Sequence, residues 1–209
     1  MIITICGVVI LGSFLACNND KRQSSTSNKS PDVPRGWSLG KGNEFIPKTK
    51  AEKNLVAQHS TYQSALFLGN TDELKRFFYK ESLEYYKKFY PDYSLDEILD
   101  DFLSTISGDA TKMLREYEDN GITFSIYIED VVREVEYGND LLYVYNVCGR
   151  LEGYIDDTLT YLHTEMPDIT LGISHNKGKN WTFMSMTNEV PSILLMNYPQ
   201  NIVDDVMGY

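Results

Sequence analysis

The sequence predicts an α+β domain in which N-terminal helices pack on one face of a curved antiparallel sheet, and three observations lead to this prediction. Apolar residues recur at helical spacing from residue 51 to about 118, and they alternate with polar residues from 122 to about 184. Runs of helices followed by runs of strands are typical of α+β domains. The chain has 209 residues, 42% of them hydrophobic, which is enough for one domain and a tail.

The helical half is divided by its own start and stop signals. Asn70 with Glu73, and Ser94 with Glu97, have the spacing of capping boxes, in which a cap side chain and a glutamate bond each other's backbone amides. Asn120-Gly121 is a typical helix end. The expected helices are 51–68, 71–89, 95–106 and a short helix that Asp109 caps and that runs through Glu118.

The second half reads as strands with strong turn signals. Residues 122–128 alternate strictly, and the pattern continues to Val135 across a bulge. Tyr137 to Asp140 form a turn. The expected strands are 122–135, 141–151, 157–166, 169–174 and 181–184, and a C-terminal helical segment follows at 189–207.

The stretch from Ser174 to Trp181, SHNKGKNW, predicts a β-hairpin. It resembles the Asp-box of sialidases and related propellers, with Asn176 in the usual aspartate position. That resemblance implies a structural turn in which polar side chains bond the backbone, Gly178 takes a positive φ and Trp181 packs beneath. Propellers repeat this motif, whereas it occurs once here.

The order of helices and strands over most of 51–187 resembles the NTF2-like or cystatin-like superfamily. The resemblance implies a helical layer cupped by the sheet, with the C-terminal helical segment added. Members of that superfamily include small-ligand binders, isomerases and noncatalytic adaptors. The fold alone therefore does not select a function.

Residues 1–16 form an uncharged apolar run that is too short to span a membrane and has the length of a signal-peptide core. The run ends in Phe14-Leu15-Ala16-Cys17, which resembles the lipobox of bacterial lipoproteins. The resemblance implies cleavage between Ala16 and Cys17 and a diacylglycerol on the Cys17 thiol, because a thiol is the strong nucleophile that this transfer needs. A plain secretory signal and a buried N-terminal strand are the alternatives.

Three regions follow from this interpretation: a signal peptide at 1–16, the lipidated cysteine with a tether at 17–50, and one domain at 51–209. Residues 18–50 are rich in serine, asparagine, lysine and proline, a composition that buries little apolar surface. The Asp20 region resembles the surface-export signals of Bacteroidetes lipoproteins. We therefore expect a bacterial cell-envelope protein, at the outer membrane or cell surface rather than the inner membrane.

Charge and cysteine content exclude several classes of function. Residues 18–50 carry a net charge of +4 and residues 51–209 a net charge of −15, and such an acidic domain repels nucleic-acid phosphates. Cys148 is the one cysteine outside the leader and Cys17, and we expect it to be a small buried apolar residue. Histidines and cysteines show no metal-ligand spacing, so we expect no metal or cofactor.

Two sets of residues are candidates for function. His163 and Glu165 share one face of a strand and would form an acid–base pair in a cavity or, as the alternative, a solvated ion pair. A dense aromatic stretch supplies a candidate partner surface, which consists of Tyr85, Tyr86, Phe89 and Tyr90. We expect a noncatalytic domain that binds a protein or small ligand, with a small enzyme using an acid–base site in an NTF2-like cavity as the alternative.

Overall fold

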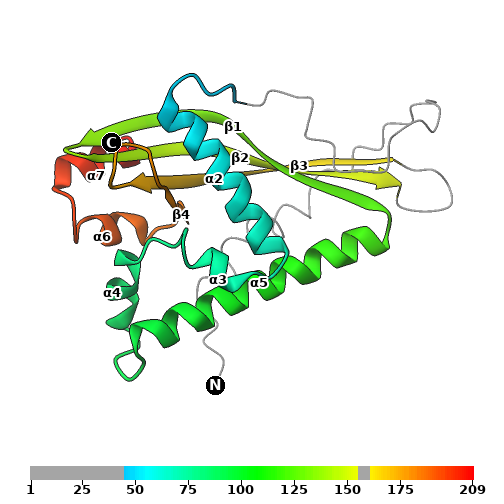
Figure 1. The fold of residues 1–209 in the computed structure, drawn as a ribbon, viewed down its shortest axis with the longest axis horizontal. Helices are drawn as coiled ribbons and strands as arrows, with labels where there is room; N and C mark the ends of the chain where they lie inside the picture. Colours follow the sequence, from blue (N-terminus) through cyan, green and yellow to red (C-terminus); the bar gives the residue numbers. More distant parts are fainter. Residues whose placement is uncertain (1–44, 155–160) are drawn as a thin grey trace.

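The computed structural model describes the backbone of residues 45–154 and 161–209, and the side chains of 45–154 and 167–209. The leader, Cys17 and most of the proposed tether lie outside the described residues. In the described part, four antiparallel strands form one open sheet in the order β1-β2-β3-β4, and helices flank it (Figure 1). The predicted α+β class is therefore confirmed.

The strands and helices agree in order with the predicted elements. The strands are β1 (Ile122–Tyr137), β2 (Asp140–Tyr154), β3 (Tyr161–Ser174) and β4 (Thr182–Ser185). The helices are α2 (Lys50–Phe67), α3 (Thr71–Leu74), α4 (Glu81–Lys87), α5 (Leu95–Asp119), α6 (Val190–Leu194) and α7 (Gln200–Met207).

Helix α5 runs unbroken where a second start at Asp109 is predicted, so that prediction is wrong. The Ser94–Glu97 capping box does open the helix, as predicted. Asp109 is exposed, while Ala110, Met113 and Leu114 continue the buried stripe of the preceding turns. A continuous apolar stripe against the core outweighs the local preference of aspartate for a cap position.

The predicted helix 71–89 is wrong in its middle. Asn70 caps α3 through the Glu73 amide, but α3 ends at Leu74 and α4 begins only at Glu81. Between them Phe78 forms a parallel bridge with Phe183, whose amide donates to the Phe77 carbonyl at 2.8 Å. An extended segment lets alternate aromatic side chains enter different parts of the core, which a helix at this place would not allow.

Two strands differ in detail from their predicted form. The predicted bulge in β1 is confirmed, because the register with β2 shifts between Ile128 and Asp130 and again between Val131 and Arg133. The predicted interruption at Pro167 is wrong, since β3 passes through it opposite Cys148. Pro167 lies beyond the residues that pair with β4, where β3 is an edge among the described strands and proline is tolerated.

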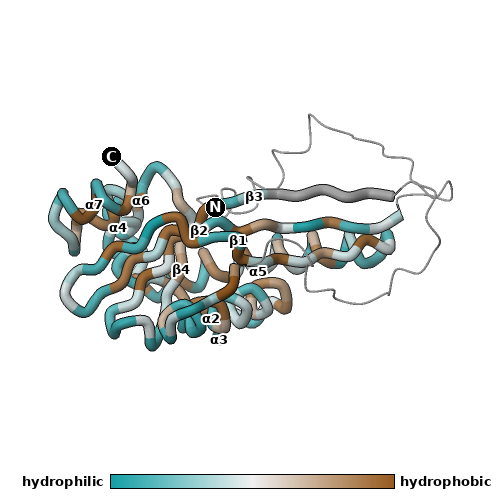
Figure 2. The backbone as a smooth tube through the Cα atoms, turned by 90° about the horizontal axis from the view of Figure 1, so that it is seen from above, coloured by the Kyte–Doolittle hydropathy of each residue, from teal (hydrophilic) through white to brown (hydrophobic). Residues whose placement is uncertain are grey.

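The sheet carries helices on both faces, which corrects the prediction of helices on one face (Figure 2). On one face, α2 and α5 pack on alternate residues such as Phe124, Tyr145 and Leu151. On the other face, α6 and α7 pack on Leu142 and Val144 of β2 and their partners on β3. Because side chains of β2 alternate between buried surfaces, this strand is apolar almost throughout.

Candidate functional site

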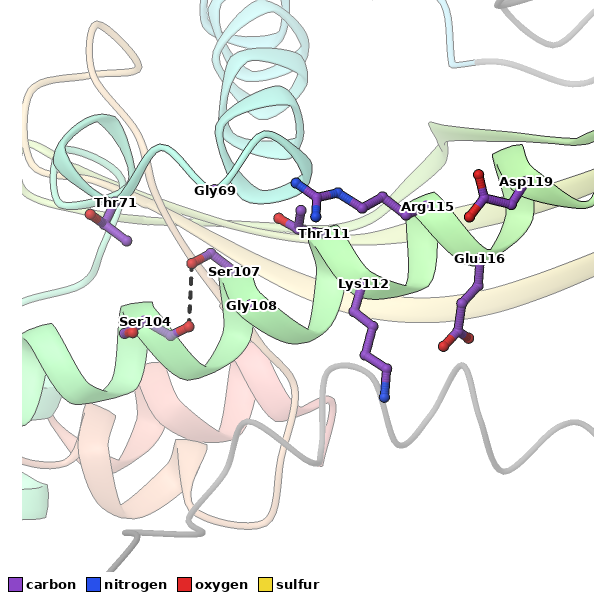
Figure 3. Close-up of a pocket in the computed structure, with 10 residues that line it drawn as sticks. All are labelled: Gly69, Thr71, Ser104, Ser107, Gly108, Thr111, Lys112, Arg115, Glu116 and Asp119. Carbon is purple, nitrogen blue, oxygen red and sulfur yellow. Dashed lines mark hydrogen bonds between the residues drawn. The ribbon is translucent and has the colours of Figure 1, made fainter.

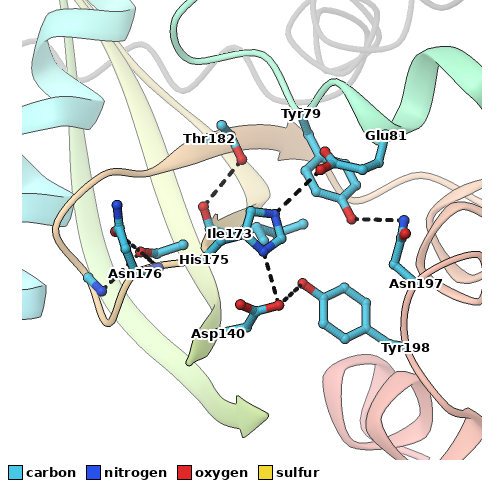
Figure 4. A network of polar contacts seen from close by, with 11 residues as sticks. Tyr79, Glu81, Asp140, Ile173, His175, Asn176, Thr182, Asn197 and Tyr198 are labelled. Atoms are coloured by element: carbon cyan, nitrogen blue, oxygen red, sulfur yellow. Dashed lines mark hydrogen bonds and ion pairs between the residues drawn. The ribbon is translucent and has the colours of Figure 1, made fainter. Parts of the chain in front are cut away.

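A network of polar side chains lies where the β1–β2 and β3–β4 turns meet the C-terminal helices (Figure 4). It joins Asp140 at the start of β2, His175 after β3, Glu81 at the start of α4, and Tyr198 between α6 and α7. His175 Nδ1 lies 3.0 Å from Asp140 Oδ2, and His175 Nε2 lies 3.7 Å from Glu81 Oε1. The Tyr198 hydroxyl donates to the same Asp140 oxygen at 2.9 Å.

A rigid turn holds His175 in place. The Gly178 amide donates to the Ser174 hydroxyl oxygen at 2.9 Å, and the side-chain oxygen Oδ1 of Asn176 accepts from the backbone amides of Lys179 and Asn180. Gly178 has φ 76° and Trp181 is 1% exposed. The predicted hairpin is thus confirmed, including the role of Asn176 in the turn.

Two tyrosines close the inner side of this cluster. Tyr79 is 1% exposed, and its hydroxyl accepts a hydrogen bond from the Asn197 amide at 3.4 Å. Burial, reinforced by nearby acidic groups, raises the pKa of both Tyr79 and Tyr198 well above the ordinary range of tyrosine. Both phenols therefore stay protonated and act as hydrogen-bonding groups rather than as bases.

The arrangement of Asp140 and His175 is one that acid–base chemistry can use, because a carboxylate on Nδ1 orients the imidazole. His175 is nevertheless about half exposed, with a side-chain exposure of 46%. The described pockets are lined by other residues. The cluster thus brings the chemical groups of a catalytic site together at a position where His175 is open to solvent.

A second group of polar side chains is buried between α2 and the sheet. His59 is 3% exposed, and burial lowers its pKa to about 3, so the ring is neutral. Its ring meets those of Tyr145 and Phe183 edge-on at 5.4 Å. Burial also raises the pKa of Tyr62 to about 12 and raises that of Asp168. The buried Tyr145 hydroxyl has no hydrogen-bond partner among the residues that the structure describes.

The alternative enzyme prediction placed a cavity between the helices and the sheet, and side chains fill the space beneath α2. Leu55, Tyr145 and Trp181 are each 1% exposed or less. The nearest pocket has a volume of about 50 Å³ and is mainly aromatic and aliphatic, with Tyr62 and Phe183 in its wall. The volume of this pocket is far below the ~300–1,000 Å³ of typical ligand sites.

A larger groove of about 490 Å³ follows the outer side of α5 (Figure 3). Hydroxyls of Thr71, Ser104, Ser107 and Thr111 line one part of it. Thr111 already donates to the Phe67 carbonyl and Ser107 to the Ser104 carbonyl. The other part carries two cations, Lys112 and Arg115, and two anions, Glu116 and Asp119. The mixture of charges favours neither an anionic nor a cationic ligand.

The candidate residues predicted from the sequence differ in their burial, and some lie outside the described residues. Tyr85, Tyr86 and Tyr90 are partly buried against the core, while Phe89 is 61% exposed. Cys148 is buried, as predicted. Ala16 and Cys17, and the side chains of His163 and Glu165, lie outside the described part.

Sequence reasoning missed the Asp140–His175–Glu81 cluster. Its residues are far apart in the chain and show no spacing rule. The one available signal was that both predicted turns, 137–140 and 174–181, carry an ionisable side chain, and every second turn of an antiparallel meander lies at the same end of the sheet.

No family model matches this chain, and neither does any curated protein. Among the described residues, no helix has the length and apolar character to cross a membrane. Nor do the described histidines, cysteines and carboxylates gather into a set that would hold a metal ion.

Proposed function

We propose that the protein is a bacterial cell-envelope lipoprotein whose domain at 51–209 is a noncatalytic binding or accessory module. The observation that carries the proposal is the apolar leader that ends in Leu15-Ala16-Cys17. Two or more acyl chains at Cys17 would anchor the protein stably, because each buried CH₂ contributes about 0.8 kcal/mol. An outer-membrane or cell-surface location fits the acidic residue that follows the cysteine.

For the fold we propose a distant kinship with the NTF2-like or cystatin-like superfamily. Helices α2 and α5 on one face of an antiparallel sheet support it. Helices α6 and α7 on the other face would be an addition to that plan.

The noncatalytic assignment is supported by the filled space beneath α2 and by the open position of His175. Ligand sites are usually concave and enclose most of a small ligand.

The lipid anchor is tested by labelling cells with an alkyne analogue of palmitate and comparing wild type with Cys17→Ala. We expect the wild-type chain to carry label and the variant to carry none, because the thiol is the acceptor. Cys148→Ala serves as the matched control and should label like wild type. Equal labelling of wild type and Cys17→Ala would refute the anchor.

An enzyme is the second candidate, and the contact of His175 with Asp140 is the observation that favours it. A noncatalytic module and an enzyme predict different contributions of this cluster to the free energy of unfolding. If the hydrogen bond between Asp140 and Tyr198 serves only to stabilise the fold, Asp140→Ala and Tyr198→Phe should each lower the free energy of unfolding by about 1 kcal/mol. A double-mutant cycle should then show coupling of at least ~0.5 kcal/mol between the two residues.

Catalytic side chains are often held in positions that lower the stability of the fold. Urea denaturation in which either substitution leaves stability unchanged or raises it would therefore favour the enzyme. Gln200→Ala is the matched control, because its bond to Asp204 lies on the exposed surface of α7 and away from the cluster.

A further inference from the structure

Helices α4 and α6 lie side by side at one end of the domain (Figures 1 and 2). Several exposed apolar residues belong to these two helices or to the segments that follow them. Of the ten large apolar residues that are exposed in the described part, four belong to this end: Phe89, Tyr93, Leu195 and Met196. We name these four, with Lys88 and Tyr85, the α4–α6 patch.

Side-chain contacts join four members of the patch: Phe89, Tyr85, Lys88 and Met196. The rings of Phe89 and Tyr85 are 5.4 Å apart, and Lys88 Nζ lies 5.7 Å from the centre of the Tyr85 ring. The same Lys88 Nζ lies 4.0 Å from the sulfur of Met196. Tyr85 is itself half-buried on the core, so it supports the exposed residues from below.

The charge of this end differs from that of the rest of the domain. Residues 80–93, which contain the α4 side of the patch, carry three lysines against two glutamates and one aspartate, and residues 190–203 carry no charged side chain. These two segments therefore have no net charge, within a domain whose net charge is −15. An anionic surface would repel the domain in most orientations and would repel it least at this end.

We propose that the α4–α6 patch rests on the surface of the lipid bilayer, with Phe89, Leu195 and Met196 inserted among the headgroups and Lys88 near the lipid phosphates. This proposal rests on the lipid anchor at Cys17. Between Cys17 and Phe45 there are 27 residues, which reach up to about 90 Å when extended. The patch can therefore reach the membrane.

Because of the lipid anchor, a weak contact between the patch and the bilayer is enough to orient the domain. A domain tethered at the membrane meets it at a high effective concentration, so a few inserted side chains bias its orientation without binding tightly by themselves. A second copy of the chain is a poorer occupant. An aromatic side chain presents only about 150–250 Å² in all. At exposed fractions of 37–61%, the four side chains together present roughly 300–450 Å². This is about half of the ~800 Å² per partner that a stable interface buries.

The test uses the full lipidated chain in vesicles of phosphatidylethanolamine and phosphatidylglycerol with brominated acyl chains, which quench only dyes that enter the bilayer. An environment-sensitive dye is attached to Met196→Cys and, as a control, to Leu68→Cys, which is an exposed position on another part of the surface. Dye uptake by wild type corrects for Cys148, which is buried. We expect a blue shift and strong quenching at Met196→Cys and neither at Leu68→Cys.

A second substitution, Phe89→Ser, should abolish the shift at Met196→Cys, whereas Val132→Ser, at another exposed apolar residue, should leave it intact. Circular dichroism checks that both variants are folded. Equal quenching of the two dyes, or quenching of neither, would overturn the proposal. So would a blue shift that grows with protein concentration in the absence of lipid, which would point to a second copy.

The two proposals fail in different ways. Loss of the anchor is seen as absence of palmitate label at Cys17. Failure of the patch is seen as an unquenched dye on a chain that does carry the label.

Discussion

His59 is the ionisable residue whose burial has the clearest consequence at the scale of single residues. The ring lies between α2 and the sheet, and the Gln63 amide nitrogen lies 3.2 Å from its Nε2. In the unfolded chain the pKa is near 6.5, and in the folded chain burial lowers it to about 3. Between these two values the unfolded state binds a proton that the folded state does not.

The free energy of unfolding should therefore fall as the pH drops below 6.5. The contribution of His59 is about 1.4 kcal/mol per pH unit, or about 2 kcal/mol at pH 5. His59→Leu should remove this dependence, so the stability difference between wild type and variant should change by that amount between pH 7.5 and pH 5. Urea denaturation at the two pH values measures it.

Protonation of Asp168 changes the free energy of unfolding in the opposite direction to protonation of His59. Burial raises its pKa in the folded state, so its protonation favours folding as the pH falls. Because Asp168 is present in both proteins, its effect cancels in the comparison. A constant difference between wild type and His59→Leu across this range would mean that His59 is not buried as described.

At the scale of elements, the hairpin from Ser174 to Trp181 is held against α2 as well as by its own turn. The Asn54 amide donates to the Gly178 carbonyl, and Gln58 bonds both the Lys179 carbonyl and the Trp181 amide. Asn54 and Gln58 are one helical turn apart on α2, and together they bond the backbone of the hairpin loop at Gly178, Lys179 and Trp181. This contact positions His175 relative to Asp140.

Gly178→Ala tests that contact. Gly178 has φ +76°, and an added Cβ would lie 2.4 Å from the Cβ of Ala51, so the helix and the turn would have to separate. We expect a loss of about 2–3 kcal/mol of stability in thermal or urea unfolding.

Gly138→Ala is the matched control for this prediction. It has φ +64° in the other hairpin, with no atom within 4 Å of the added Cβ. It should lose only the backbone term of about 1 kcal/mol. Equal losses in the two variants would contradict the described contact between the hairpin and α2.

At the scale of the whole molecule, the buried apolar residues form three clusters: one packed on α5, one on α2, and one on α6 and α7. Strand β2 contributes residues to all three clusters. Leu142 and Val144 face α6 and α7, Tyr145 faces α2, and Leu151 faces α5. A strand shared by all three clusters couples them, so the described domain should unfold as one unit.

Leu142→Ala tests this coupling, because Leu142 is fully buried in the cluster with α6 and α7 while Trp181 lies in the cluster with α2. We expect a loss of about 2–5 kcal/mol. In a Trp37→Phe background, Trp181 fluorescence and far-ultraviolet circular dichroism should show the same shifted midpoint. Separate midpoints would indicate that the two faces unfold independently.

Local signals in the sequence determined the start of α5, the turn at 174–181, the order of helices and strands, and the contrast between a basic N-terminal segment and an acidic domain. These features depend on neighbouring residues, such as Ser94 with Glu97 or Asn176 with the amides that follow it. A cap or turn bonds its own backbone, so its pattern is visible within a few residues.

Only the tertiary structure decided which surfaces these elements cover. It continued α5 through Asp109, broke the predicted helix at Phe78, and placed α6 and α7 on the second face of the sheet. It also brought Asp140 and His175 together and left Phe89 exposed while burying its aromatic neighbours. Each outcome depends on packing between residues far apart in the chain, and that free energy outweighs local preferences of a few tenths of a kcal/mol to ~1 kcal/mol per residue.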